Sequence, residues 1–369
     1  MKFQIATEEL VRALARVQGI VERRSTNPII ANVLLEATAQ GLTVTATDTQ
    51  VGLTADYPAE VTSTGRITCT ARPLFEIVRA MPVDTIEIAL EGESLKVSGG
   101  SSSFDLRVLP ADEFPPVPLF EGEPSFSIKG SDLRELIELT AFAISTDETR
   151  TGLNGAHLEI EDGDLGRRLL MVATDGHRLS LAGRPVEGGE ELSTLLVARK
   201  GLMELKRALE SNDSDVQARR EGSQLLFRWG KTTFVTRLLE GQFPDFRQVI
   251  PKSWQRRVAI RRDALLSALK RVSVLAPEKS NAVRIELEPG GVVLQSRHTE
   301  LGSARIPVEA EVEGKELHLG FNARYFRDVL SVVPRNELSI EIGDSLSPTL
   351  VRTVGDESVL FVVMPMRLE

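Results

Sequence analysis

The sequence has few of the residues from which disulfide frameworks and metal sites are built. Among 369 residues it has one cysteine, Cys69, and four histidines, and no Cys/His cluster has the spacing of zinc ligands. We therefore expect no disulfide, no metal and no cofactor, and a reducing compartment, the cytoplasm. No window approaches the roughly 18 apolar residues of a membrane span, so we expect neither export nor membrane insertion.

The motifs of common enzyme classes are also missing. No GxGxxG follows a predicted strand, and neither GxSxG nor HExxH occurs. Gly230–Thr233 (GKTT) is similar to the end of a phosphate-binding loop, but Leu225 stands where that loop needs glycine. A hydrolase or transferase using Asp175 and His177 would need a nucleophile and an oxyanion or metal site, and neither is found. We expect no catalytic residue and no enzymatic activity.

Positively charged residues are in the minority. Lys and Arg number 44 against 53 Asp and Glu, which gives a net charge of −9. A protein with this balance does not attract phosphate over its whole surface. Any surface for nucleic acid must therefore be local.

What the sequence does contain is a threefold internal repeat. Each third has an amphipathic helix near its start, a second helix later, and β-hairpins between and after the helices. The first helices are predicted at Thr7–Val21, Ser131–Ile144 and Arg262–Leu275, with Thr7 and Ser131 as N-caps. The second helices are predicted at Ala71–Met81, Ala198–Glu210 and Asn322–Val332, with Leu74, Leu202 and Tyr325 at similar places.

Turn residues separate the thirds at Phe114–Pro124 and Phe243–Pro251. They predict three domains, at residues 1–125, 126–252 and 253–369. The expected fold class is α+β, with two helices packed on antiparallel sheets in each domain.

The charge of the predicted helices differs from that of the whole chain. The six helices and their flanks carry 17 Lys/Arg and 11 Asp/Glu, a net charge of +6 that leaves −15 for the remainder. Ordinary solvated helix faces would explain this, and so would a basic surface that holds a polyanion. Twelve helices from two chains, packed about 10 Å apart, would enclose a hole of roughly 28 Å. A DNA duplex could pass through it, held by phosphate contacts that carry no sequence information.

Two short motifs are candidates for a binding site. Thr174–Arg178 (TDGHR) contains an Asp-Gly turn signal, which accounts for Asp175 without chemistry. His177 and Arg178 fit either plain surface positions or a binding role. Near the C-terminus, a buried strand explains Val359–Val363 but not Met364–Met366 (MPM). Methionine side chains adapt to several apolar partners, so these residues suit an exposed pocket.

Motifs along the whole chain resemble the bacterial DNA polymerase III beta subunits, the sliding clamps. They are Arg24 with Asn27–Asn32, Leu153–Gly155, Ala173–Leu179, Arg199–Gly201, Gly241–Phe246, Gly320–Asn322 and Val362–Leu368. The resemblance implies three DNA-clamp domains per subunit and two subunits assembled head to tail into a closed ring, with helices facing double-stranded DNA. It also implies a non-catalytic processivity factor that tethers the replicative polymerase.

The resemblance implies two sets of site residues. DNA contacts fall on Arg24, Arg72, Arg150, Arg199 and Lys200. The polymerase catalytic subunit, the clamp loader, and other polymerases and repair proteins insert a short apolar peptide between the second and third domains. The implied pocket comprises Leu153, Thr174, Gly176, His177, Arg178, Leu179, Pro244, Val249, Asn322, Tyr325, Leu346, Pro348, Val362, Val363, Met364, Pro365, Met366 and Arg367.

A few positions depart from the family pattern. The loop Ser145–Gly152 is acidic, Leu346 and Pro348 stand where smaller or polar residues often occur, and Glu369 follows the usual terminal leucine. The alternative function is a repeat-built scaffold that binds proteins without encircling DNA.

Overall fold

The computed structural model of the protein describes residues 1–21, 27–163, 166–189, 194–210 and 213–368. The chain forms two compact units, and the boundary between them runs through the second repeat. Unit 1 comprises Met1–Arg134, Val186–Glu191 and Lys200–Leu238, and unit 2 comprises Glu135–Pro185, Leu192–Arg199 and Leu239–Glu369. Each outer repeat therefore shares a unit with part of the second repeat.

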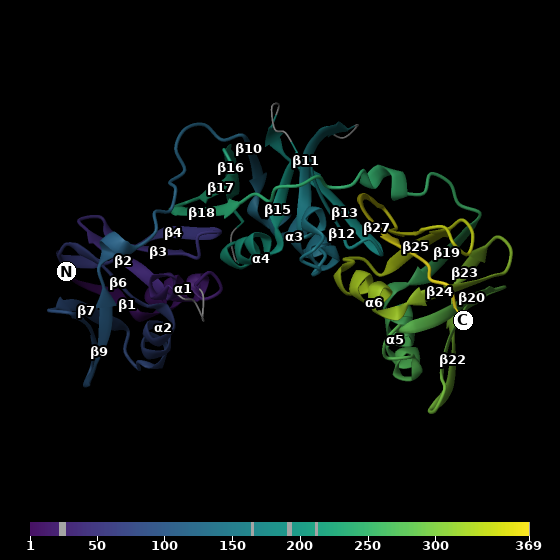
Figure 1. Ribbon diagram of the computed structural model, residues 1–369, viewed down its shortest axis with the longest axis horizontal. Helices are drawn as coiled ribbons and strands as arrows, with labels where there is room; N and C mark the ends of the chain where they lie inside the picture. Colours follow the sequence, from purple (N-terminus) through teal and green to yellow (C-terminus); the bar gives the residue numbers. More distant parts are fainter. Residues whose placement is uncertain (22–26, 164–165, 190–193, 211–212, 369) are drawn as a thin grey trace. The chain divides into compact units, whose positions relative to one another are not determined.

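Unit 1 is built on one antiparallel sheet with the strand order β14-β10-β16-β17-β18-β4-β3-β2-β6-β9-β8-β7-β1-β5. Its first-repeat strands are β1 (Lys2–Ala6), β2 (Asn32–Thr38), β3 (Gly41–Thr47), β4 (Val51–Tyr57), β5 (Glu60–Ser63), β6 (Gly65–Thr70), β7 (Thr85–Glu91), β8 (Ser94–Gly99) and β9 (Ser102–Leu109). Its second-repeat strands are β10 (Phe126–Lys129), β14 (Glu187–Gly188), β16 (Asp215–Glu221), β17 (Gln224–Trp229) and β18 (Thr232–Arg237). Helices α1 (Thr7–Val17) and α2 (Ala71–Ala80) pack side by side on this sheet (Figure 1).

Unit 2 contains two antiparallel sheets, ordered β15-β11-β12-β13-β27-β26-β25-β19-β23 and β22-β21-β20-β24. Its second-repeat strands are β11 (Gly155–Gly163), β12 (Gly166–Thr174), β13 (Arg178–Pro185) and β15 (Leu195–Ala198). Its third-repeat strands are β19 (Arg256–Arg261), β20 (Ala282–Glu288), β21 (Gly291–His298), β22 (Gly302–Glu309), β23 (Glu311–Glu313), β24 (Leu317–Asn322), β25 (Glu337–Ile342), β26 (Thr349–Thr353) and β27 (Asp356–Val363). Helices α5 (Arg262–Val272) and α6 (Ala323–Val332) pack together (Figure 1). The second repeat contributes helices α3 (Gly130–Thr140) and α4 (Arg199–Ala208).

One strand pairing in each unit joins neighbouring repeats, and we call these pairings seams. In unit 1, β4 of the first repeat pairs with β18 of the second, with Val51 opposite Thr236. In unit 2, β13 of the second repeat pairs with β27 of the third, with Arg178 opposite Val363. Both seams are antiparallel ladders of backbone hydrogen bonds, so they do not depend on particular side chains.

The predicted N-caps are wrong, because each first helix starts directly from a strand. Ala6, the last residue of β1, occupies the N-cap position of α1, and Thr7 is the first helical residue. Ser131 likewise lies inside α3, which begins at Gly130. The first amides of the helices donate to main-chain carbonyls instead: Thr7 to Asp84 at 2.9 Å, Gly130 to Ser214 at 3.0 Å and Arg262 to Asn336 at 2.8 Å. Each acceptor directly precedes β7, β16 or β25, so the contact recurs in every repeat.

The predicted helices are confirmed, but α1, α3 and α5 end earlier than expected. The Thr140 hydroxyl donates to the Leu136 carbonyl at 2.7 Å, and the Ser273 hydroxyl donates to the Leu269 carbonyl at 2.5 Å. Such bonds compete with the helical ladder, and 3-10 turns follow at Ala141–Ala143 and Ser273–Leu275. The prediction that Tyr325 occupies the same helix position as Leu74 and Leu202 is also wrong.

The starts of the second helices give the correct equivalence. Leu74 and Leu202 are the fourth residues of α2 and α4, and the fourth residue of α6 is the buried Phe326. Tyr325 is the third residue and is only partly buried. Its equivalent in α4 is Gly201.

The helices bury one face and expose the other. In α5 the buried residues are Leu265, Ala268, Leu269 and Val272, whereas Lys270 and Arg271 are exposed. This spacing follows the helical period, so the basic side chains lie away from the sheet.

Cys69 on β6 is fully buried. Burial disfavours the thiolate and raises the pKa of the Cys69 thiol to about 12. The thiol therefore stays protonated at neutral pH.

We predict that Gly201→Ala destabilises the protein, because a Cβ there would lie 2.1 Å from the Thr236 hydroxyl oxygen. Overpacking of this kind costs about 1–3 kcal/mol. Urea unfolding should show a lower midpoint for Gly201→Ala and recovery in the double variant Gly201→Ala/Thr236→Ala. Gly163→Ala is the control, since its Cβ would meet other atoms only at 3.7 Å and beyond. Equal midpoints for the two single variants would contradict the prediction.

Candidate functional site

The predicted pocket residues all belong to unit 2, and several of them come together from segments far apart in the sequence. The turn between β12 and β13 lies beside the segment that follows β27, because the Met364 amide donates to the His177 carbonyl at 2.9 Å. The Met366 amide donates to the Gly320 carbonyl at 2.8 Å, which ties the same segment to β24. Helix α6 follows β24 directly. Residues of the second and third repeats thus form one surface.

The turn that presents His177 is held by its own polar side chains. Asp175 Oδ1 accepts hydrogen bonds from the amides of His177 at 2.9 Å and Arg178 at 3.0 Å. The Thr174 hydroxyl donates to the Arg178 carbonyl at 2.7 Å. Gly176 has φ +87°, which favours glycine. The predicted turn is confirmed, and it leaves His177 exposed.

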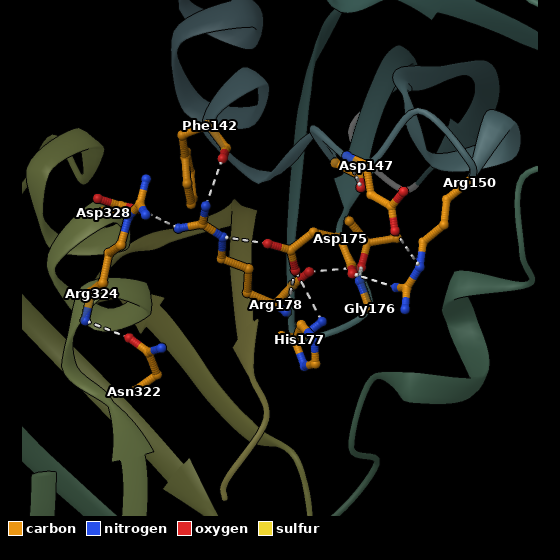
Figure 2. Close-up of polar contacts among 12 residues, drawn as sticks. Phe142, Asp147, Arg150, Asp175, Gly176, His177, Arg178, Asn322, Arg324 and Asp328 are labelled. Carbon is orange, nitrogen blue, oxygen red and sulfur yellow. Dashed lines mark hydrogen bonds and ion pairs between the residues drawn. The ribbon is translucent and has the colours of Figure 1, made fainter. Parts of the chain in front are cut away.

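Arg178 lies at the centre of the site and is 8% exposed. Its Nε donates to Asp175 at 3.1 Å, its Nη1 to Asp328 at 2.5 Å and its Nη2 to the Phe142 carbonyl at 2.9 Å (Figure 2). The guanidinium carbon also lies 5.1 Å from the centroid of the Phe142 ring and 5.0 Å from that of Tyr325. A buried cation of this kind is stabilised by both carboxylates and both rings.

His177 and Tyr325 form the aromatic part of the surface. Their rings are stacked, with centroids 5.8 Å apart and planes 10° apart. Burial, followed by the nearby Asp175 carboxylate, raises the pKa of the Tyr325 phenol above its ordinary value of 10.0. The phenol is therefore neutral at physiological pH and offers an apolar face with a polar tip.

Several predicted pocket residues have other roles. Leu179 and Val362 belong to a buried cluster with Leu170, Leu350 and Phe246, and Val363 is fully buried. Asn322 caps α6 by accepting from the Arg324 amide at 2.9 Å. Thr174 is buried; Leu153, Pro348, Met364, Pro365 and Met366 are partly buried, and Gly176, Pro244 and Arg367 are exposed.

Two apolar residues at the edge of the site face solvent. Val249 is 40% and Leu346 is 60% exposed. Leu346 follows Asp344, whose carboxylate accepts from the amides of Leu346 and Ser347, both at 2.8 Å. These bonds lower the pKa of Asp344 and fix the loop that carries Leu346.

The described residues among the predicted DNA contacts are divided between the units, with Arg72 and Lys200 in unit 1 and Arg150 and Arg199 in unit 2. Arg72 is exposed on α2 and pairs with Glu76 at 2.8 Å, and Arg199 is exposed at the start of α4. Lys200 forms an ion pair with the buried Asp48. Arg150 lies beside the turn that presents His177, donating to the Asp175 carbonyl at 3.1 Å (Figure 2). Arg24 lies outside the described residues.

The sequence analysis missed Asp328 and Phe142 as site residues. A signal for Asp328 is present, because a cation and an acid four residues apart recur at the same helix positions in each repeat. The pairs are Arg72/Glu76, Lys200/Glu204 and Arg324/Asp328. No comparable signal in the sequence marks Phe142, which contacts Arg178 through its backbone carbonyl and its ring.

The described residues include no helix long and apolar enough to cross a membrane. Within the same residues, no group of three or more His, Cys, Asp or Glu side chains could hold a metal ion.

The repeated helix–sheet units and an aromatic and apolar surface between two repeats define a three-repeat α+β binding protein. Models of the DNA polymerase III beta subunit match residues 1–118 (N-terminal domain), 127–245 (central domain) and 247–367 (C-terminal domain). The chain belongs to the DNA polymerase III beta subunit family, a family of non-catalytic processivity factors.

Relatives match over the full length of the chain. Proteins named Beta sliding clamp from Caulobacter vibrioides and Pseudomonas aeruginosa are 35% and 37% identical, each covering 100% of both chains. The crystal structure of the beta subunit from Thermotoga maritima matches with a TM-score of 0.93 at 30% identity, also over 100% of both chains. A clamp from Bartonella birtlesii bound to griselimycin matches with a TM-score of 0.95 at 32% identity, again with full coverage.

We predict that neither tyrosine ionises at its ordinary pKa, because the pKa values of both Tyr57 and Tyr325 are raised from 10.0 by burial. Because the tyrosine pKa values are higher in the folded state than in the unfolded state, this difference contributes to the free energy of unfolding, and the contribution is fully present below pH 10. It is lost as pH rises through the pKa of the folded state. An ultraviolet titration of phenolate should show both transitions above pH 10. In Tyr325→Phe only the Tyr57 transition should remain. A transition at pH 10 in the folded wild-type protein would contradict this assignment.

Proposed function

We propose that this chain is a sliding clamp, which encircles double-stranded DNA and tethers the replicative polymerase for processive synthesis in the cytoplasm. The observation that carries the proposal is the match of all three repeats, over the full chain, to beta sliding clamps. The basic excess on the helices supports it, because Lys and Arg hold phosphates without reading sequence. The proposed domains are residues 1–125, 126–252 and 253–369.

The ring closes, in this proposal, by a third seam between two subunits joined head to tail. Each seam within the chain follows the same rule. The strand that follows the first hairpin of one repeat pairs with the strand that follows the second hairpin of another repeat. In this way β4 pairs with β18, and β13 pairs with β27. In the third repeat the strand equivalent to β4 and β13 is β22, and in the first repeat the strand equivalent to β18 and β27 is β9. β22 ends its sheet, and the described partner of β9 over Ser102–Arg107 is β8 alone. With the register of the two seams within the chain, the third seam places Gly302 opposite Leu106 of the partner subunit.

Exposed apolar side chains support this third seam. Phe104 on β9 is 40% exposed. Leu301, directly before β22, is 67% exposed, and Val274, in the 3-10 turn that packs beside β22, is 76% exposed. Burying these side chains between subunits would add apolar contact to the backbone ladder.

DNA contacts in the proposal are made by Arg24, Arg72, Arg150, Arg199 and Lys200. Arg72 and Lys200 already have carboxylate partners, Glu76 and Asp48. Partial neutralisation weakens each contact to phosphate, which suits a protein that must slide. The proposed contacts are therefore weak and sensitive to salt.

The proposed partner site is the surface around His177, Tyr325 and Met364–Met366. The polymerase catalytic subunit, the clamp loader, and other polymerases and repair proteins would insert a short apolar peptide there. The clamp structures from Pseudomonas aeruginosa and Bartonella birtlesii bound to griselimycin support a small-ligand site in this family.

We predict that the protein, loaded on DNA, is retained on a closed circle and lost from the same DNA after linearisation at equal salt. A ring linked by topology escapes only from an end, whereas a surface-bound protein dissociates equally from both forms. Gel filtration of the two complexes measures retention. Equal retention would contradict encirclement and indicate binding to the DNA surface.

We predict that Val274→Asp converts the dimer to monomer, because it places an unpaired charge in the third seam. Sedimentation velocity measures the change. Leu119→Asp is the matched control, since Leu119 is also exposed, at 58%, and lies outside the proposed seam. The third seam is wrong if Val274→Asp sediments as the wild-type dimer does.

A further inference from the structure

We propose that Asp328 is a positioning residue of the partner site. It holds Arg178, and Arg178 holds the His177–Tyr325 pair in the geometry that an apolar partner meets. The inference rests on the proposed function, since it concerns the same surface. It also changes the role of Arg178 from a residue that contacts the partner to one that supports the surface.

Arg178 is already engaged within the protein through all three of its guanidinium nitrogens. Each of its three guanidinium nitrogens donates a hydrogen bond, to Asp175, Asp328 and the Phe142 carbonyl. The Phe142 and Tyr325 rings lie at 5.1 and 5.0 Å from its carbon. With 8% of the residue exposed, the cation has little surface left for a partner.

Asp328 connects this cation to the helix that carries Tyr325. Asp328 and Tyr325 are three residues apart on α6, so they share one face of the helix. The Arg178–Asp328 ion pair, at 2.5 Å, therefore holds α6 in the orientation in which the Tyr325 ring stacks on His177. Arg324, 3.8 Å from the same carboxylate, is exposed and is the weaker partner.

The seam in unit 1 has no equivalent of Arg178, because Val51 occupies that place after the turn. There the turn supplies the acid, Asp48, and the helix supplies the cation, Lys200. The helix position equivalent to Tyr325 is Gly201, with no room for a side chain beside Thr236. Of the two described seams, the one in unit 2 thus has both the Arg178–Asp328 ion pair and the stacked His177–Tyr325 pair.

The experiment measures binding of griselimycin to full-length variants by calorimetry. Asp328→Asn keeps the shape of the side chain and removes its charge, so affinity should fall about tenfold or more. Asp328→Glu should recover part of the loss. His177→Ala is the positive control for the site. Glu135→Gln is the matched control. Glu135 pairs at 2.7 Å with Arg184, another arginine of β13, so this variant also removes the carboxylate partner of a β13 arginine but not one at the aromatic pair.

A second readout separates positioning from general stability. The Tyr325 ring shifts the NMR resonances of the stacked His177 ring, and Asp328→Asn should move these resonances in the free protein while Glu135→Gln leaves them unchanged. Wild-type affinity together with unmoved His177 resonances in Asp328→Asn would overturn the inference. If the wild-type protein does not bind griselimycin, the proposed partner site fails, and the His177 resonances still decide the role of Asp328.

Discussion

Backbone pairing between repeats is the constraint on which the rest of the structure depends. The seams β4–β18 and β13–β27 make each unit continuous across a repeat boundary. Because the hydrogen bonds come from the main chain, the side chains next to a seam are free to differ. One pattern of pairing can therefore support a closed contact in unit 1 and the proposed binding surface in unit 2. The same pattern leaves β9 and β22, the strands of the proposed third seam.

The contrast between the two seams shows how a repeated framework acquires one specialised site. In unit 1 the Asp48–Lys200 pair and the close approach of Gly201 to Thr236 leave no space for an aromatic side chain. In unit 2 the turn keeps its acid, Asp175, and α6 keeps a cation and an acid, Arg324 and Asp328. Arg178 stands in the place of Val51, and Tyr325 in the place of Gly201. A small number of substitutions at equivalent positions accounts for the difference.

Much of the fold followed from periodicity. The six helices and the hairpins could be predicted because burial of one helix face repeats at a fixed spacing. The N-caps at Thr7 and Ser131 could not, because the acceptors of the first helical amides, Asp84 and Ser214, are supplied by distant strands. For the proposed site, His177 and Met364 could be proposed from the motifs that contain them. Asp328 was not, because its partner Arg178 is 150 residues away in the sequence.

Cys69 gives the protein a further property. A thiol with no exposed surface and a pKa of about 12 presents no thiolate to peroxide or to another thiol. With its single cysteine buried and protonated, the folded protein offers oxidants no exposed thiol for a disulfide between subunits. Exchange of subunits is left to non-covalent forces under oxidising and reducing conditions alike.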